Sequence, residues 1–307
     1  MVFVVSIIKS LNMFKSWLTE GFRPTIAVLA LLLCSTVQAA EPEPAPQDEK
    51  PDALRVCQDP NNLPNSNLKG EGFENRIAEL LAAKLGVPLQ YYSTPQRLGF
   101  VRNSLKFKLP GDAHFRCDVV IAAPVNNDQM SVTKPYFRSG EVLVFNPDGP
   151  LKGLTSVEEL ASKPKEALAK LRIAVYDRDS SASQWLVHNG LEDQAVPLRL
   201  MDARPDFHAG EIVERVIRGE VDAALVWGPV AGYYAKKVAQ HPLALLPLPA
   251  VDDEHPTAFA IGMGLRYGEP KWKATLQSLI DSNHAELFAI LKDYGIPLLD
   301  EKGNLLP

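Results

Sequence analysis

The chain has 307 residues, of which 46% are hydrophobic and 22% are charged, so it is long enough for two ordinary domains and too apolar to be disordered. Its 32 basic and 37 acidic residues give a formal net charge of −5 at pH 7. This balance argues against a nucleic-acid partner, because a general nucleic-acid-binding protein needs an excess of basic charge to neutralise phosphates.

Residues 1–39 are predicted to be a secretory signal peptide. An apolar run over residues 25–37 follows basic residues and leads into a small-residue cleavage pattern. The run is too short to cross a bilayer, so we expect the mature chain not to insert into a membrane. The sequence leaves open whether Met1 or Met13 is the true start. Residues 40–53 are rich in proline and acidic side chains, and they are expected to form an extended, solvated linker.

Two cysteines, Cys57 and Cys117, remain once the predicted signal peptide, which contains Cys34, is removed. An even number of cysteines in an oxidising compartment permits one disulfide, and both residues lie beside predicted strands of the same domain. These observations favour a Cys57–Cys117 bridge. The alternative is a pair of buried thiols on separate strands, too far apart to be joined.

Short apolar runs alternate with helical periodicity from Leu54 onward. The first unit contains predicted strands at 54–57, 89–92 and 118–122 and predicted helices at 72–85 and 99–107. This alternation predicts a parallel sheet. A further strand is expected at 141–145, followed by a turn.

A second alternating unit begins near Ser156, where a capping-box pattern predicts a short helix. The last part of the chain returns to a strand and two helices. In chain order, the later elements are predicted at 172–176 (strand), 181–188 (helix), 211–218 (helix), 223–227 (strand), 230–238 (helix), 243–248 (extended), 258–263 (strand), 272–280 (helix) and 285–291 (helix).

Catalytic and cofactor motifs are missing from the sequence. It has no nucleophile elbow, zinc-protease motif, phosphate-binding loop or paired-cysteine redox motif, and its six histidines never fall at ligand spacing. The acidic run Asp252–Glu254 is expected to be solvated. We therefore predict a protein that is not an enzyme and that has neither a cofactor nor a metal site.

Polar residues gather in the loops where predicted strands end. Asp59, Asn61 and Asn62 follow the first strand, and Glu74 lies at the start of the next helix. In an open parallel sheet, ligands bind at the carboxyl ends of the strands. In the second unit, Ser180 and Ser181 occupy the corresponding loop, either to hold an anion or simply to cap a helix.

Three segments resemble the periplasmic solute-binding proteins found with amino-acid transporters: residues 54–64, 70–75 and 133–139. Residues 95–103 and 117–120 are similar to the branch associated with quinoprotein alcohol and methanol dehydrogenases, the MoxJ/XoxJ-like proteins. The resemblance covers essentially all of residues 54–298.

The resemblance implies an α/β fold of the type II periplasmic-binding class, with parallel-rich mixed sheets, helices on both faces and two crossover segments at a hinge. It divides the chain into a first lobe at 54–145, a second lobe at 146–248 and a return segment to the first lobe at 249–307. The expected location is the periplasm, and a hinged cleft between the lobes is expected to carry the function.

The sequence departs from the amino-acid receptors of this family at two places. Residues 122–131 lack the arginine that holds a ligand carboxylate, and Trp227 lies near the place where an aspartate pairs with the ammonium group. Loss of these two charge-assisted contacts, each worth about 1.5–3 kcal/mol, makes capture of ordinary amino acids doubtful. Trp227 is expected either to stack on a ligand or to close the lobes.

The leading hypothesis is that the protein is an accessory component of a PQQ-dependent dehydrogenase system. In this role it would dock to the dehydrogenase or to a c-type cytochrome, or it would handle a small organic ligand. A transporter-linked solute receptor is the alternative, and a lyase of the same fold is a third. The predicted ligand- or partner-binding residues are Asp59, Asn61, Asn62, Glu74, Arg97, Arg102, Tyr136, Ser180, Ser181 and Trp227.

Overall fold

The computed structural model describes residues 51–96, 99–177, 180–199, 207–252 and 254–307. All of these belong to one compact unit, Asp48–Pro307. The predicted signal peptide and nearly all of the predicted linker lie outside the described residues. Among the described residues, no helix is both long and apolar enough to cross a membrane.

The chain begins with a strand, a helix and a second strand, as predicted. Strand β1 (Leu54–Gln58) pairs in parallel with β4 (Leu89–Ser93), and α1 (Phe73–Leu85) connects them along the chain. A small hairpin of β2 (Asn61–Asn62) and β3 (Ser66–Asn67) lies between β1 and α1. Helix α1 ends where Gly86 takes a left-handed conformation with φ of 62°, which glycine adopts without strain.

The larger sheet has eight strands, most of them antiparallel to their neighbours. Its order is β5-β12-β7-β10-β8-β9, with β6 beside β12 and β11 beside β7. Strand β8 pairs in parallel with both β9 and β10. The strands are β5 (Val120–Pro124), β6 (Ser131–Val132), β7 (Phe137–Phe145), β8 (Ile173–Tyr176), β9 (Ala195–Leu198), β10 (Ala223–Trp227), β11 (Ala244–Pro247) and β12 (Ala258–Leu265).

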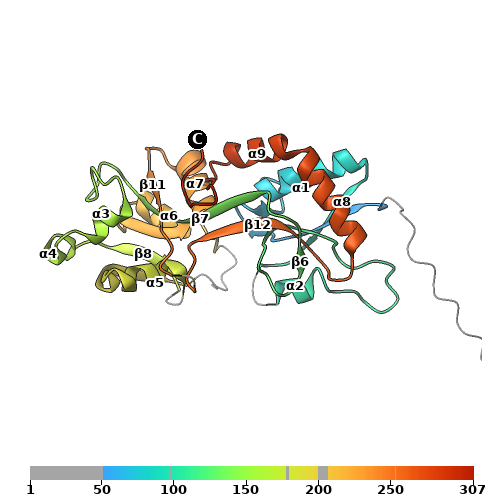
Figure 1. Ribbon diagram of the computed structural model, residues 1–307, viewed down its shortest axis with the longest axis horizontal. Helices are drawn as coiled ribbons and strands as arrows, with labels where there is room; N and C mark the ends of the chain where they lie inside the picture. The colour runs from blue at the N-terminus through green and yellow to red at the C-terminus, as the bar shows by residue number, and fades with distance from the viewer. Residues whose placement is uncertain (1–50, 97–98, 178–179, 200–206, 253) are drawn as a thin grey trace, which may run out of the picture. The chain divides into compact units, whose positions relative to one another are not determined.

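Strand β7 is shared by two lobes, which we define by their cores below. Residues 137–140 of β7 pair with β12, whereas its residues from Glu141 onward pair with β10. Figure 1 shows β7 and β12 as long strands that run between the two halves of the described unit. The change of partner occurs at Glu141, inside the strand, and the lobe boundaries at 145 and 248 stay a prediction.

The helices cover the sheets from both faces. In the first lobe they are α1, α2 (Phe100–Asn103), α8 (Pro270–Ser282) and α9 (His284–Asp293). In the second lobe they are α3 (Val157–Ala161), α4 (Lys165–Leu168), α5 (Ser181–His188), α6 (Glu211–Ile217) and α7 (Gly228–Tyr233), which continues into a π-helical turn over Tyr234–Val238. A 3-10 turn at Glu192–Gln194 follows α5.

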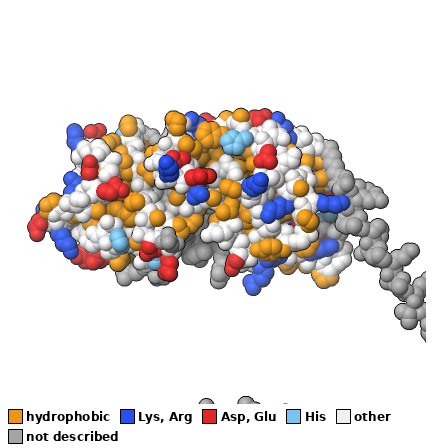
Figure 2. All heavy atoms as spheres, viewed as in Figure 1, with side chains coloured by type: hydrophobic (Ala, Val, Ile, Leu, Met, Phe, Trp, Pro, Cys, Tyr) orange, Lys and Arg blue, Asp and Glu red, His pale blue; other side chains and the backbone are white. Residues whose placement is uncertain are grey.

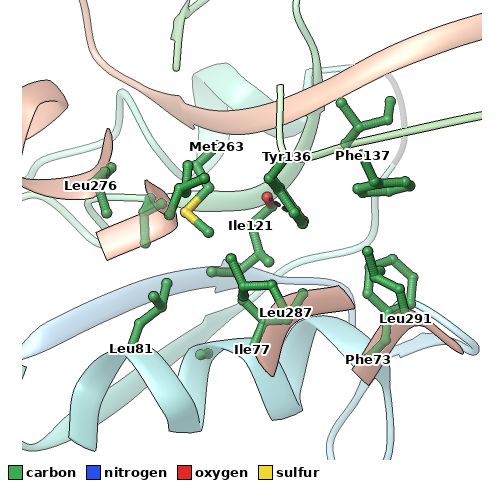
Figure 3. Packing of buried hydrophobic residues seen from close by; sticks show 14 of the residues in the cluster. Phe73, Ile77, Leu81, Ile121, Tyr136, Phe137, Met263, Leu276, Leu287 and Leu291 are labelled. Atoms are coloured by element: carbon green, nitrogen blue, oxygen red, sulfur yellow. Dashed lines mark hydrogen bonds between the residues drawn. The ribbon is translucent and has the colours of Figure 1, made fainter. Parts of the chain in front are cut away.

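Each lobe has its own buried core. In the first lobe, Phe73, Ile77 and Leu81 project from one face of α1 into a buried cluster that includes Ile121 and Phe137 (Figure 3). In the second lobe, alternate residues of β7 enter different clusters: Leu143 lies on one face of the sheet and Val144 on the other. This alternation is the period of two that a strand covered on both faces requires.

The disulfide predicted between Cys57 and Cys117 is present, with the two Cα atoms 5.2 Å apart. It ties β1 to the segment just before β5. Phe100, Val101 and Leu105 pack around it in a small buried cluster.

Several predicted boundaries differ from the observed ones by one or more residues, and the backbone hydrogen bonds account for two of the differences. The helix predicted at 99–107 is only α2, because the backbone leaves the helical conformation at Ser104 (φ −122°, ψ −82°) and the Lys106 amide donates to the Val101 carbonyl, five residues earlier. The strand predicted from Asp118 begins at Val120, because the amides of Asp118 and Val119 both donate to the Arg55 carbonyl, which bends the chain.

Candidate functional site

A cavity of about 710 Å³ lies between the two lobes. Its first-lobe wall comes from the loop after β1, the loop after β4 and the end of β5, and its floor comes from β7 and β10. The described lining residues are Asp59, Pro60, Asn61, Asn62, Asn65, Phe73, Pro95, Gln96, Ala122, Pro124, Phe137, Glu141, Tyr176, Asp177, Ser180, Ala182, Phe207, His208, Ala209, Leu225, Val226, Trp227, Val230 and Ile261.

The loop after β1 forms a hydrogen-bonded polar wall. The Asp59 carboxylate accepts from the backbone amides of Asn61 and Gln96, and the Asn62 side chain donates to Gln96 Oε1 at 3.1 Å. The Asn61 side chain donates across the cavity to the Phe207 carbonyl at 3.3 Å. This last contact joins the first-lobe wall to the second lobe.

The floor of the cavity carries Glu141 and Trp227. These residues lie directly opposite one another on the antiparallel strands β7 and β10. Trp227 also meets Phe259 edge to face, with ring centroids 5.8 Å apart. The turn after Trp227 lies tightly on β7, because a Cβ atom on Gly228 would come within 2.6 Å of the Gly140 carbonyl oxygen.

Burial raises the pKa of Glu141 from 4.5 to about 7. Its backbone is satisfied, since its amide donates to the Thr257 carbonyl and its carbonyl accepts from the Leu248 amide. Its carboxyl makes no hydrogen bond or ion pair with any residue that the structure describes. The other acidic or histidine side chains on the described cavity wall are Asp59, Asp177 and His208.

The second-lobe wall is formed mainly by aromatic residues and by the start of α5. Tyr176 packs edge to face on Phe207, with centroids 6.2 Å apart, and donates to the Ala209 carbonyl. Ser180 lies at the cavity and caps α5, because its hydroxyl accepts from the Ser183 amide. Ser180 therefore caps the helix as one of its two predicted roles requires, and its predicted role in holding an anion stays a prediction.

One group of side chains near this wall has the composition of a metal site. His208, Glu211 and Glu214 have candidate ligand atoms within 4.8 Å of one another. Arg215 lies 3.2 Å from Glu211, and Arg218 lies 3.3 Å from Glu214. Because the arginines already balance both carboxylates, ion pairing within α6 accounts for the group.

Glu74 also has a raised pKa and is buried, but it does not line the cavity. It is 6% exposed, and its Oε1 accepts a 2.7 Å hydrogen bond from the Asn65 side chain. Burial raises its pKa to about 7, although the bond from Asn65 acts in the opposite direction.

The structure brings half of the predicted site residues to the cavity, namely Asp59, Asn61, Asn62, Ser180 and Trp227. Ser181, Glu74, Arg102 and Tyr136 lie elsewhere, and Arg97 lies outside the described residues.

Tyr136 belongs to the core and not to the cavity. It is 4% exposed and donates to the Ile121 carbonyl at 3.1 Å. Figure 3 shows it among the buried side chains of the first lobe.

Sequence reasoning missed Glu141, Tyr176 and Phe207 as lining residues. For Glu141 a signal existed, because it is the one acidic residue in an otherwise apolar strand segment, 141–145.

Comparison with known proteins supports the fold and its class. The periplasmic binding protein XoxJ from Methylobacterium extorquens AM1 is 32% identical; the match covers 81% of this chain and 100% of that one, with a TM-score of 0.63. The structure of MxaJ from Methlophaga aminisulfidivorans MPT is 23% identical over 80% of this chain and 100% of that one, with a TM-score of 0.65, which shows a shared fold. Protein MoxJ of Methylorubrum extorquens is 28% identical over 303 residues, covering 90% of this chain and 93% of that protein. No family model matches the chain. The predicted two-lobed periplasmic-binding fold is confirmed.

Proposed function

The chain belongs to the MoxJ/XoxJ family of periplasmic binding proteins, and from this premise we propose that it is exported to the periplasm and serves a PQQ-dependent alcohol dehydrogenase as a non-catalytic accessory protein. The observation that carries this proposal is the 32% identity to XoxJ over the whole of that chain. The mature protein would dock to the dehydrogenase or to its c-type cytochrome.

The cavity fits this role better than that of an amino-acid receptor. The described lining contains acidic side chains and a histidine but no lysine or arginine. A receptor for amino acids needs a cationic side chain to bind the ligand carboxylate, and a bidentate arginine is the strongest such partner. The alternative is a transporter-linked receptor for another kind of ligand, and the test must distinguish this receptor from an accessory protein of a dehydrogenase.

We place the docking surface on α2 and on the segment between α2 and β5. Arg102, Lys106 and Lys108 are exposed there, and the side chain of Arg116 lies 5.7 Å from the centre of the Phe107 ring. Lys106 lies over the Tyr267 ring at 5.7 Å. Aromatic rings beside arginine are typical of protein interfaces, and a basic surface on an acidic protein suits an acidic partner.

Phe100 and Val101 are 8% and 7% exposed and pack around the disulfide, whereas the neighbouring Arg102, Lys106 and Lys108 face solvent. The Cys57–Cys117 bridge anchors the segment on which these cations lie. An anchored segment loses less conformational entropy on binding, which favours docking.

Capture of the dehydrogenase by the immobilised mature protein tests the proposal. We expect the purified PQQ-dependent dehydrogenase to be retained, and the Arg102→Ala/Lys106→Ala double variant to bind it about tenfold or more weakly, as expected from loss of one or more charge-assisted contacts. Lys170→Ala, which removes an exposed lysine from the second lobe, is the matched control and should bind like the wild type. A double variant with unchanged melting temperature and unchanged retention would refute this surface. Capture of a permease in place of the dehydrogenase would favour the receptor alternative.

A further inference from the structure

Glu141 and Trp227 form a pair on the cavity floor. Because they are directly opposed on antiparallel strands, their Cβ atoms are neighbours and their side chains project from the same face of the sheet. Both line the cavity. The pair therefore presents a carboxyl group beside an aromatic ring to whatever enters.

The Glu141 carboxyl lacks a partner among the described residues, and the residue is partly buried at the cavity floor. A charged group taken out of water is unfavourable unless an opposite charge or hydrogen-bond donors compensate it. Its raised pKa has this cause. The buried Glu74 carboxyl, by contrast, accepts a hydrogen bond from the Asn65 side chain, so a donor within the protein already compensates its burial. A cationic group in the cavity would supply the opposite charge and the hydrogen-bond donor that the Glu141 carboxylate lacks.

The rest of the described wall limits the chemistry of the ligand. Phe73, Phe137, Tyr176 and Phe207 offer apolar and aromatic surface, and Asp59 and Asp177 add negative charge. An ammonium group gains from a carboxylate and from the face of an aromatic ring at once. An acidic group on the same ligand would meet these carboxylates without a described lysine or arginine to neutralise it.

We infer that the cavity binds a small organic ammonium ion that lacks an acidic group, with its charge on the Glu141 carboxylate and its apolar body against Trp227. This binding activity goes beyond docking to a dehydrogenase and does not depend on it. The sequence had placed the ammonium-pairing group of amino-acid receptors near Trp227 and found it missing, and the neighbouring strand supplies a carboxylate at that position.

The test uses three probes that differ by one group each. Phenethylamine carries the ammonium ion and a ring, 2-phenylethanol replaces the ammonium with a neutral hydroxyl, and L-phenylalanine adds a carboxylate. Calorimetry on the full-length mature protein at pH 8 should show phenethylamine binding at least tenfold more tightly than either of the others. L-phenylalanine should bind no more tightly than about 100 μM, or roughly −5.5 kcal/mol.

Two variants test whether the ammonium group of the ligand binds at Glu141. Glu141→Gln keeps the shape of the side chain and should weaken phenethylamine at least tenfold while leaving 2-phenylethanol unchanged. Glu158→Gln makes the same replacement at an exposed position on α3, away from the cavity, and should bind like the wild type.

The inference fails if phenethylamine and 2-phenylethanol bind the wild type equally, if L-phenylalanine matches phenethylamine, or if phenethylamine does not bind at millimolar concentration. These comparisons use the wild type, so they hold even if a variant does not fold. It also fails if a folded Glu141→Gln variant retains full affinity. Each result is independent of dehydrogenase capture, so the docking proposal and this inference can fail separately.

Discussion

On the first-lobe wall of the cavity, polar side chains bond to one another, whereas on the floor the Glu141 carboxyl meets no partner among the described residues. Asp59 accepts two backbone amides, and Asn62 bonds to Gln96. The wall is therefore held in place by its own hydrogen bonds. On the floor, strand pairing sets Trp227 opposite Glu141, Trp227 packs on Phe259, and the Glu141 carboxyl stays available.

Whether a carboxyl has a hydrogen-bond partner within the protein distinguishes Glu74 from Glu141, although both have a raised pKa. Burial raises the pKa of both Glu74 and Glu141 to about 7. Glu74 has a hydrogen-bond donor in Asn65 and does not line the cavity, while Glu141 faces the cavity without one. A raised pKa alone does not identify a ligand-binding residue; the presence or absence of an internal partner does.

Removing the disulfide should give the largest effect on stability. The Cys57–Cys117 bridge closes a loop with a sequence separation of 60 residues, for which chain entropy predicts a stabilisation of about 4 kcal/mol. A Cys57→Ala/Cys117→Ala double variant should lose that amount in urea unfolding. Alkylation of the wild type without reductant is the control: mass spectrometry should find neither cysteine labelled, and labelling at both would mean that the bridge does not form.

Removing the donor to Glu74 should have the next largest effect. Asn65→Ala leaves a buried acceptor without its side-chain partner, which should lower the free energy of unfolding by about 1–3 kcal/mol. Asn62→Ala on the same wall is the matched control, because its bond to Gln96 is exposed to solvent and should be worth about 0.5 kcal/mol. Equal losses in the two variants would contradict the view that burial makes the Glu74 partner matter.

The sequence predicted the elements with strong local signals. The apolar face of α1, its glycine stop and the buried strand β10 follow from periodicity and turn chemistry, and the structure has them at nearly the predicted residues. Helix α2 is shorter than predicted because the backbone leaves the helical conformation at Ser104, and the Lys106 amide donates to the Val101 carbonyl in place of a helical partner. Apolar periodicity carries no signal for such a change in backbone conformation.

The candidate site was harder to predict because it forms between segments far apart in the chain. Glu141 and Trp227 become neighbours only through the register of β7 and β10, and a shift by one residue would turn one of them away. Tyr136 was predicted as a site residue but lies in the core. It sits in a segment that resembles a binding motif, but its hydroxyl is satisfied by the Ile121 carbonyl inside the core.

The smallest expected effect is a pH-dependent gain in stability for Glu141→Gln. The pKa of Glu141 is about 7 in the folded protein and near 4.5 in the unfolded chain, so the folded state binds the proton more tightly. Stability from this group is complete below pH 4.5 and is lost as the pH rises through 7. Glutamine cannot ionise, so the free energy of unfolding of the variant does not fall with pH through this group.

We therefore expect Glu141→Gln to match the wild type in urea unfolding at pH 4.5 and to exceed it by about 1–2 kcal/mol at pH 8, a value reduced from the full linkage because the carboxyl faces the water-accessible cavity. Asp59, Asp177 and His208 line the same cavity in both proteins, so their contributions largely cancel in the difference. Asp177→Asn is the control, since it removes a cavity carboxyl away from Trp227 and should show no such gain between the two pH values. An equal gain for Asp177→Asn would mean that the general negative charge of the cavity, and not the isolation of Glu141, sets the effect.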